Sequence, residues 1–327
     1  MAGLADEGLE EAAGAPPAMP SAMSPAFVRV VPVRGHRRSH WLGRRLLDIA
    51  FLMRLHRPIG IWLLLWPTVW ALWIAGDGHP PPRLLLLFLA GTVLMRSAGC
   101  VVNDLADINI DPHVRRTRHR PLAARRMSPR EALAVFVALL AVALVVVLQL
   151  NLLCLQLSLA GAALTITYPL FKRFFPIPQL YLGLAFGWGV PMAFAAQLGF
   201  VPRVGWVMLL ATVLWAGIYD SFYAMADRSD DLKVGVKSSA ITFGDLDLVM
   251  IGAMQLLMLL ALYFTGRLLV FGTPWHAGLC VATAMFAAQQ WRARTRAPED
   301  CLWAFNNNTA VGLVILAGLV VDYTSGH

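Results

Sequence analysis

"LLLLFLAGTVLMRSAGCVVNDLADINIDP", residues 84–112, begins as an apolar run and ends with three carboxylates. The apolar part is long enough to cross, as a helix, a bilayer hydrocarbon core about 30 Å thick. Asp104, Asp107 and Asp111 follow directly after it. An ionised carboxylate in apolar surroundings costs about 2.5–3.5 kcal/mol, so these acids require compensating charge nearby.

Composition indicates that the chain is a polytopic membrane protein. Hydrophobic residues make up 58% of the 327 residues and charged residues only 14%, whereas soluble domains carry about 25% charged residues. Apolar runs recur along the chain, which predicts an all-α fold with about nine transmembrane helices. The predicted spans are 59–76, 84–103, 131–149, 152–168, 180–198, 204–222, 248–266, 270–290 and 309–323.

The basic residues predict the orientation of these spans. With a cytoplasmic N-terminus, the cytoplasmic segments carry 23 of the 27 Lys and Arg residues, while Arg96 lies within a span. The other side carries only Arg83, Arg203 and Arg267. This bias follows the positive-inside rule. The net charge of +8 therefore reflects topology beside anionic lipid and does not require a nucleic-acid partner.

The N-terminal residues differ in composition from the rest of the chain. Residues 1–25 are acidic and rich in Ala and Pro, with neither the basic start nor the apolar run of a signal peptide. We predict a disordered, basic extension over 1–45 and a transmembrane domain over 46–327, with an interfacial segment from about Trp41. Acidic residues argue against a transit peptide, so we expect a bacterial inner membrane, with the mitochondrial inner membrane as the alternative. The four cysteines and eight histidines show no disulfide or zinc spacing.

A second acidic segment, "YDSFYAMADRSDDLKVGVKS" (219–238), has similar geometry to the first. On a helix, Asp220, Asp227 and Asp231 fall within about 40° of one face. The first segment, if helical to about Asp111 with Pro112 ending it, places its three acids within about 60°. Each segment precedes a basic loop on the cytoplasmic side. A single acidic cluster of this kind is usually a solvated helix end, but two matching clusters favour a shared cavity.

Facing carboxylates repel each other unless cations separate them. Mg²⁺ prefers oxygen ligands and is typically held by one or two carboxylates plus substrate phosphates. Two acidic faces with Arg and Lys in the adjoining loops therefore predict a Mg²⁺-dependent site for a diphosphate. A cation transporter is the alternative of a different class, but such a protein usually distributes its acids through the membrane depth.

The first predicted span carries a stripe of tryptophans. Trp62, Trp66, Trp70 and Trp73 lie within about 80° of one helix face. The stripe either packs against other helices, forms an interfacial belt, or provides an aromatic wall for an isoprenoid substrate.

"NDLADINID" resembles the first aspartate motif of the UbiA superfamily of intramembrane aromatic prenyltransferases, and the segment 219–238 resembles the second. "MRLHRPIGIWLLLWPTVWALW", "MRSAGCVVND", "RRTRHRPL", "TYPLFKR", "PQLYLGLAFGWGVPMAFAA" and "PEDCLWAFNNNTAVGL" extend the resemblance, in order, from about Arg54 to the C-terminal region. The sequence is most similar to the branch that acts on 4-hydroxybenzoate in ubiquinone biosynthesis.

The resemblance implies nine helices around a central cavity, with Mg²⁺ shared by two aspartate motifs. It implies transfer of a polyprenyl group from polyprenyl diphosphate to the ring of 4-hydroxybenzoate, ortho to the hydroxyl. Homogentisate, a naphthoate, chlorophyllide and haem are alternative acceptors within the superfamily. The implied metal ligands are Asp104, Asp107, Asp111, Asp227 and Asp231, with Asp220 as a further catalytic acid. The implied substrate-binding residues are Asn103, Arg116, Arg120, Tyr168, Lys172, Arg173 and Lys237.

Roles within this set follow from the same resemblance. Arg116, Arg120 and Lys237 would bind the diphosphate, and Lys172 or Arg173 would bind the acceptor carboxylate. Asp220 or a diphosphate oxygen would remove the ring proton. Arg54, Arg57 and Arg96 stay open: each either faces the substrate or extends to the membrane interface. Ile108 departs from the basic or polar residue that relatives often carry there.

Overall fold

The computed structural model describes residues 37–326 except Arg115 and Lys172. Residues 42–327 form one compact unit, and residues 1–41 fall outside it. The described residues contain helices and no strand, which confirms the predicted all-α class. Most of the predicted extension over 1–45 lies outside the described residues, and Arg37 begins the first helix, α1.

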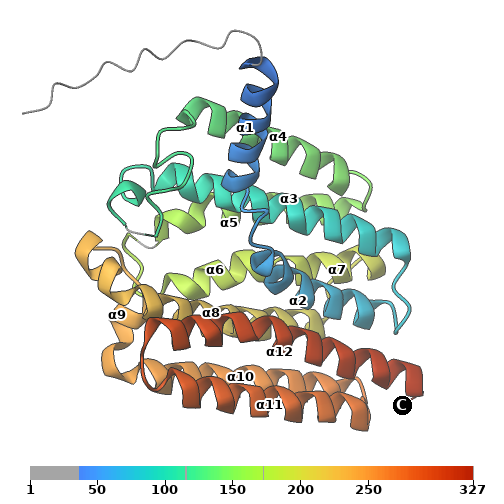
Figure 1. Ribbon diagram of the computed structural model, residues 1–327. Coiled ribbons are helices and arrows are strands. Elements are labelled where there is room, and N and C mark those ends of the chain that lie inside the picture. Colours follow the sequence, from blue (N-terminus) through green and yellow to red (C-terminus); the bar gives the residue numbers. More distant parts are fainter. Residues whose placement is uncertain (1–36, 115, 172, 327) are drawn as a thin grey trace, which may run out of the picture. The chain divides into compact units, whose positions relative to one another are not determined.

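Most helices follow one another through short connections, and a longer loop, residues 107–128, joins α3 to α4 (Figure 1). They are α1 (Arg37–Leu52), α2 (Ile59–Ala75), α3 (Pro82–Ala106), α4 (Pro129–Val147), α5 (Leu152–Phe171), α6 (Pro178–Gly187), α7 (Gly189–Leu198), α8 (Arg203–Val234), α9 (Ser239–Phe243), α10 (Asp247–Leu268), α11 (Thr273–Ala293) and α12 (Pro298–Ser325). Two 3₁₀ turns, η1 (Asp111–His113) and η2 (Gly244–Leu246), complete the set.

Each predicted span coincides with one of these helices, or, for 180–198, with the pair α6 and α7. Seven helical segments in the described part of the chain are long and apolar enough to cross a membrane. The 17-residue helix α2 is a shorter apolar helix, and α11 is not among the seven. The chain is therefore an integral membrane protein, while the predicted count of nine crossings is not confirmed.

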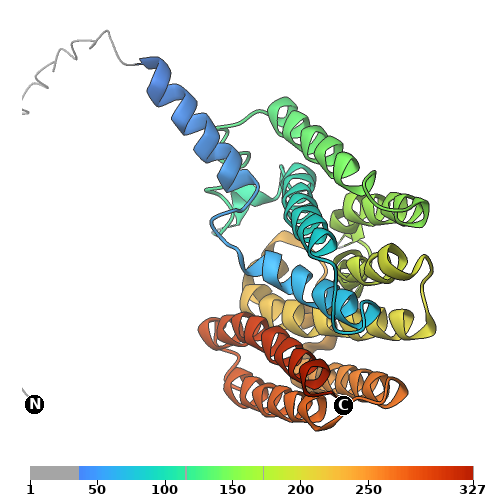
Figure 2. The ribbon, with the colours of Figure 1, turned by 90° about the vertical axis from the view of Figure 1, so that its right-hand side faces the viewer.

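Helix α8 lies between the two halves of the unit that spans residues 42–327. It packs against α6 on one side and against α10 and α12 on the other. Figure 2 shows α10, α11 and α12 grouped together beyond α8, and α3, α4 and α5 grouped on the opposite side. The second acidic segment lies toward the C-terminal end of this central helix, where Asp220, Asp227 and Asp231 are half-buried.

Tryptophan side chains join α8 to its neighbours. The Trp70 ring from α2 stacks on Trp215 from α8, with ring centroids 5.2 Å apart. The indole N–H of Trp70 donates to the Gly312 carbonyl at 3.1 Å, and that of Trp215 donates to Asn308 Oδ1 at 2.9 Å. Both acceptors lie on α12. Because apolar lipid provides little driving force for helix association, such close packing and hydrogen bonds hold membrane helices together.

Gly312 permits this packing. A Cβ atom at position 312 would lie 2.7 Å from Trp215 Cη2 and would also overlap the Trp66 ring. We therefore expect Gly312→Ala to reduce stability by about 1–3 kcal/mol, the usual cost of overpacking. Gly91→Ala is the control, because a Cβ there would meet no described atom within 4 Å. Thermal unfolding of both variants in detergent measures the difference, and equal melting temperatures would contradict this packing.

Candidate active site

The first acidic segment follows the end of α3. The helix ends at Ala106, so the expectation that it continues to about Asp111 is wrong. The chain instead turns, with the Asp111 N–H donating to the Asp107 carbonyl at 2.9 Å, and Asp111 begins the short turn η1. This turn keeps the three acids together without a regular helix. Asp104, Asp107 and Asp111 are all buried.

Two arginines pair with Asp104 and Asp111 of the first segment. Arg54, which precedes α2, donates from Nη2 to Asp104 Oδ1 at 2.6 Å. Arg120 donates from Nη1 to the same Asp104 oxygen at 3.0 Å and to Asp111 Oδ2 at 2.7 Å. Burial raises the pKa of Asp111 above its usual value; Arg120 opposes this effect, whereas the charges of Asp104 and Asp107 add to it. These contacts are the charge compensation that buried carboxylates require.

The second acidic segment lies on α8 itself. The helix continues past the predicted span end at residue 222 to Val234, and Gly235 then adopts a left-handed conformation with φ 72°. Asp220, Asp227 and Asp231 therefore lie on one regular helix, as the spacing predicts. Arg116 pairs with Asp227 through Nε to Oδ1 at 3.2 Å and through Nη2 to Oδ2. The same guanidinium lies 4.7 Å from the centre of the Tyr223 ring.

One loop connects the two acidic segments. Arg120 contacts the first segment and Arg116 contacts the second, although the two arginines are only four residues apart. Thr117 lies between them and donates its hydroxyl to the Asp111 carbonyl at 2.9 Å. The structure therefore brings both acidic segments against the same basic loop, as the two-cluster hypothesis requires.

The donor set is suited to magnesium bound together with phosphate. Among the described residues, no group of three or more His, Cys, Asp or Glu side chains is arranged to hold a metal ion. Arginine side chains instead bond to Asp104, Asp111 and Asp227. Mg²⁺ typically takes only one or two carboxylates, the other ligands being water and substrate phosphate. Carboxylates on two neighbouring segments fit that chemistry.

The other predicted site residues lie around these segments. Asn103, on the last turn of α3, is half-buried. Arg173 is exposed and donates from Nη2 to the Ala106 carbonyl at 2.7 Å. Lys237 is exposed in the loop after α8, and Lys172 lies outside the described residues. Tyr168 donates its hydroxyl to the Gly99 carbonyl at 3.3 Å.

Arg96 is a further candidate site residue, to which the motifs assign no role. It lies within α3, donates from Nη1 to Cys100 Sγ at 2.6 Å, and lies 5.8 Å from the Phe186 ring centre. Gly60 makes room for it, because a Cβ there would overlap the guanidinium. Together with Tyr168, Arg96 lines a cavity of about 30 Å³. The sequence signal was a cation inside an apolar span, which marks a functional residue by default.

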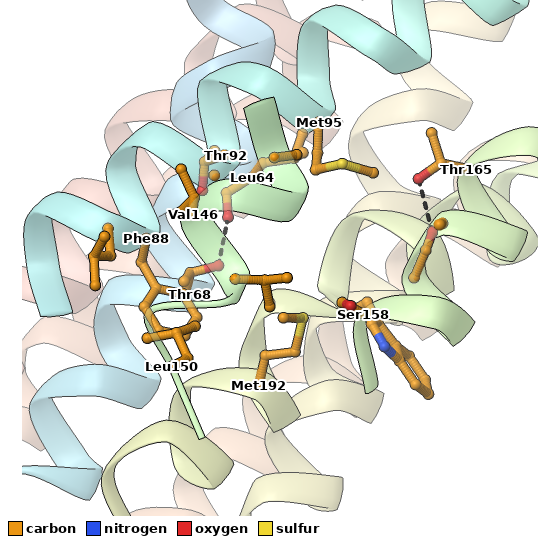
Figure 3. A pocket seen from close by; sticks show the side chains of 18 of the residues that line it. Leu64, Thr68, Phe88, Thr92, Met95, Val146, Leu150, Ser158, Thr165 and Met192 are labelled. Atoms are coloured by element: carbon orange, nitrogen blue, oxygen red, sulfur yellow. Dashed lines mark hydrogen bonds between the residues drawn. The ribbon is translucent and has the colours of Figure 1, made fainter. Parts of the chain in front are cut away.

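A larger cavity lies next to this one. It has a volume of about 270 Å³ and lies between α2, α3, α4, α5 and the α6–α7 pair. The two cavities share lining residues, among them Met95, Thr165 and Phe186. Figure 3 shows Thr68 and Thr165 hydrogen-bonded to the carbonyls of Leu64 and Gly161 on their own helices, which leaves an apolar wall.

The large cavity extends away from the acids along α3. Phe88 and Gly91 line it, and at 1.5 Å per residue Phe88 lies about 24 Å along the helix axis from Asp104. Among the described lining residues, α2 contributes Leu64 and Thr68 and none of its four stripe tryptophans. The stripe tryptophans therefore do not line this cavity, and their role as an aromatic wall for the substrate stays a prediction. Trp70 is buried against α8 and α12 instead, because the close approach at Gly312 directs the stripe to those helices.

Sequence comparison identifies the family. Residues 64–313 match the UbiA prenyltransferase family, which covers most of the chain. The chain belongs to this family. The resemblance to the UbiA superfamily is thereby confirmed.

Relatives within the family have closely similar sequences. The chain is 53% identical over 280 residues to 4-hydroxybenzoate octaprenyltransferase of Nitrosococcus oceani, covering 86% of this chain and 98% of that protein. It is 51% identical over 286 residues to the protein of the same name from Alkalilimnicola ehrlichii, covering 88% and 98%.

Solved structures share the fold. A UbiA homologue from Aeropyrum pernix, in its apo form, superposes with a TM-score of 0.69 at 28% identity, covering 80% of this chain and 97% of that one. A UbiA homologue from Archaeoglobus fulgidus bound to DMAPP and Mg²⁺ superposes with a TM-score of 0.66 at 17% identity, covering 86% and 100%. At 17% identity, this second superposition shows only that the two chains share a fold. DMAPP and Mg²⁺ are ligands of the Archaeoglobus fulgidus homologue.

Proposed function

We propose that this UbiA-family protein transfers a polyprenyl group from polyprenyl diphosphate to the ring carbon of 4-hydroxybenzoate ortho to the hydroxyl, releasing diphosphate, in ubiquinone biosynthesis. The observation that carries the proposal is the loop whose Arg116 and Arg120 contact both acidic segments. The names and the high identity of the relatives support the choice of substrates.

Mg²⁺ is the proposed cofactor, held by Asp104, Asp107, Asp111, Asp227 and Asp231 together with substrate phosphate. Their carboxylate oxygens are the ligands that Mg²⁺ prefers. When bound, the ion would neutralise charge that develops on the departing diphosphate.

The remaining residues of the site bind and orient the two substrates. Arg116, Arg120 and Lys237 bind the diphosphate, together with Asn103 on the last turn of α3. The polyprenyl tail occupies the apolar cavity that runs along α3, which also excludes water from the reacting carbon. The cytoplasmic side of a bacterial inner membrane is the proposed location of the acidic segments, because the basic residues concentrate there.

The acceptor carboxylate needs a cation near the allylic carbon. Arg96 is suited to this role, because its guanidinium borders the small cavity that adjoins the tail cavity. Of the two motif-based candidates, Arg173 instead bonds to the end of α3, and Lys172 lies outside the described residues. Once the ring carbon has bonded to the allylic carbon, either Asp220 or a diphosphate oxygen accepts the ring proton.

The first test is product formation. Purified protein with octaprenyl diphosphate and 4-hydroxybenzoate should form the 3-octaprenyl product only with Mg²⁺, and EDTA should abolish it. Asp227→Asn should lower kcat by about 10²- to 10³-fold, the usual loss when one transition-state electrostatic contact is removed. Chromatography of the products provides the readout, with homogentisate and a naphthoate as competing acceptors. Preferential prenylation of either competitor would contradict the assignment.

The second test separates the two candidate anchors of the acceptor. Arg96→Met should raise KM for 4-hydroxybenzoate about 10- to 100-fold, corresponding to the loss of a charged hydrogen bond worth about 1.5–3 kcal/mol. KM for the polyprenyl diphosphate should change little. Arg173→Met is the matched variant. A rise in KM for the acceptor with Arg173→Met alone would assign the role to Arg173.

The third test concerns the tail cavity. Gly91→Leu should place a side chain in it, because a Cβ at Gly91 meets no described atom within 4 Å. Since overpacking costs about 1–3 kcal/mol, kcat/KM for octaprenyl diphosphate should fall about tenfold or more. Dimethylallyl diphosphate, whose tail is too short to reach Gly91, is the internal control. An equal loss with both substrates would show that the tail lies elsewhere.

A further inference from the structure

Arg54 contacts the first acidic segment although it belongs to neither aspartate motif. It lies between α1 and α2, and its guanidinium donates to Asp104 Oδ1 at 2.6 Å. Asp104 has only 1% of its side chain exposed, so the contact is shielded from solvent. Few of the cations on the cytoplasmic side lie this close to a buried acid, and Arg57, three residues away, is exposed.

The backbone holds Arg54 in a conformation that is unfavourable for a residue other than glycine. Its φ is 55°, in the left-handed region. Two hydrogen bonds stabilise the turn, from the Leu55 N–H to the Ala50 carbonyl at 3.1 Å and from the Arg57 N–H to the Arg54 carbonyl at 3.0 Å. Such strain costs roughly 1–3 kcal/mol and is concentrated at functional positions.

The arginines occupy carboxylate oxygens that a metal ion would use. Arg54 and Arg120 both bond to Asp104 Oδ1, Arg120 also bonds to Asp111, and Arg116 bonds to both oxygens of Asp227. Within these described pairs, three guanidinium groups face three carboxylates, so their charges cancel.

Because of this charge balance, the binding of Mg²⁺ and the binding of diphosphate depend on each other. Mg²⁺ alone would bring positive charge beside guanidinium groups that already neutralise Asp104, Asp111 and Asp227. A diphosphate alone would bring negative charge beside the carboxylates. When both arrive, the arginines can bond to phosphate oxygens and release carboxylate oxygens to the metal. Charge-assisted hydrogen bonds to phosphate are at least as suitable for arginine as those to carboxylate.

We propose that Arg54 is a diphosphate-binding residue that, in the absence of diphosphate, blocks the metal site by occupying Asp104. The inference rests on the proposed function and deepens it: divalent metal binds well only when an allylic diphosphate draws Arg54 away from Asp104. The site therefore selects a metal–diphosphate pair rather than free metal.

The test measures metal binding without turnover. Full-length protein in detergent is titrated with Mg²⁺ in the absence of diphosphate, and thermal unfolding reports saturation. Arg54→Gln should lower the half-saturating Mg²⁺ concentration at least about fivefold, the lower end of typical couplings between sites. The same variant should bind a non-hydrolysable allylic thiolodiphosphate, at saturating Mg²⁺, several-fold more weakly. Arg57→Gln, at an exposed arginine, should leave both values unchanged.

An Arg54→Gln variant that needs the same or a higher Mg²⁺ concentration overturns the proposal. If this variant does not fold, Arg116→Gln repeats the test at Asp227, where the paired side chains are 34% and 21% exposed and tolerate the loss better. An unchanged Mg²⁺ requirement there also overturns it. Failure of the proposed function would instead appear as a missing prenylated product with both substrates present, whatever the metal titration shows.

Discussion

The central interaction of this structure is the pairing of buried aspartates with arginines from the segments that connect the helices. A carboxylate as buried as Asp104 is tolerated only with a partner, and Arg54 and Arg120 supply it. The basic loop then brings the two acidic segments together, because Arg120 bonds to one and Arg116 to the other. The position of the loop, the burial of the acids and the interior placement of α8 are therefore mutually dependent.

The same arrangement explains how one site can serve an ionic and an apolar ligand group. The charged groups are concentrated at the end of α3 and the last turns of α8, whereas the large cavity is lined by apolar side chains and by threonines bonded to their own helices. A molecule with an anionic head and a long apolar tail matches this division. Close packing of α2, α8 and α12 around Gly312 gives the charged end a rigid support.

Much of the fold and of the site could be predicted from the sequence. Apolar length located the helices, and aspartate spacing indicated that Asp220, Asp227 and Asp231 share a face of α8. The end of α3 was predicted too late, because the turn after Asp107 preserves an i to i−4 hydrogen bond that periodicity cannot distinguish from a helix. The tryptophan stripe was ambiguous for a related reason: spacing defines a face, but only the glycine on α12 determines what that face contacts. Arg54 and Arg96 had no assigned role, because their partners are distant in sequence or belong to no motif.

The most direct measurement is a structure of the protein with Mn²⁺ and an unreactive allylic diphosphate, with the metal located by anomalous scattering. The account predicts that carboxylates of both the 104–111 and the 220–231 segments reach metal ions that contact the same diphosphate, at coordination distances of about 2.1 Å. Metal ligated by one segment alone, with the other too distant for the diphosphate to bridge, would contradict it.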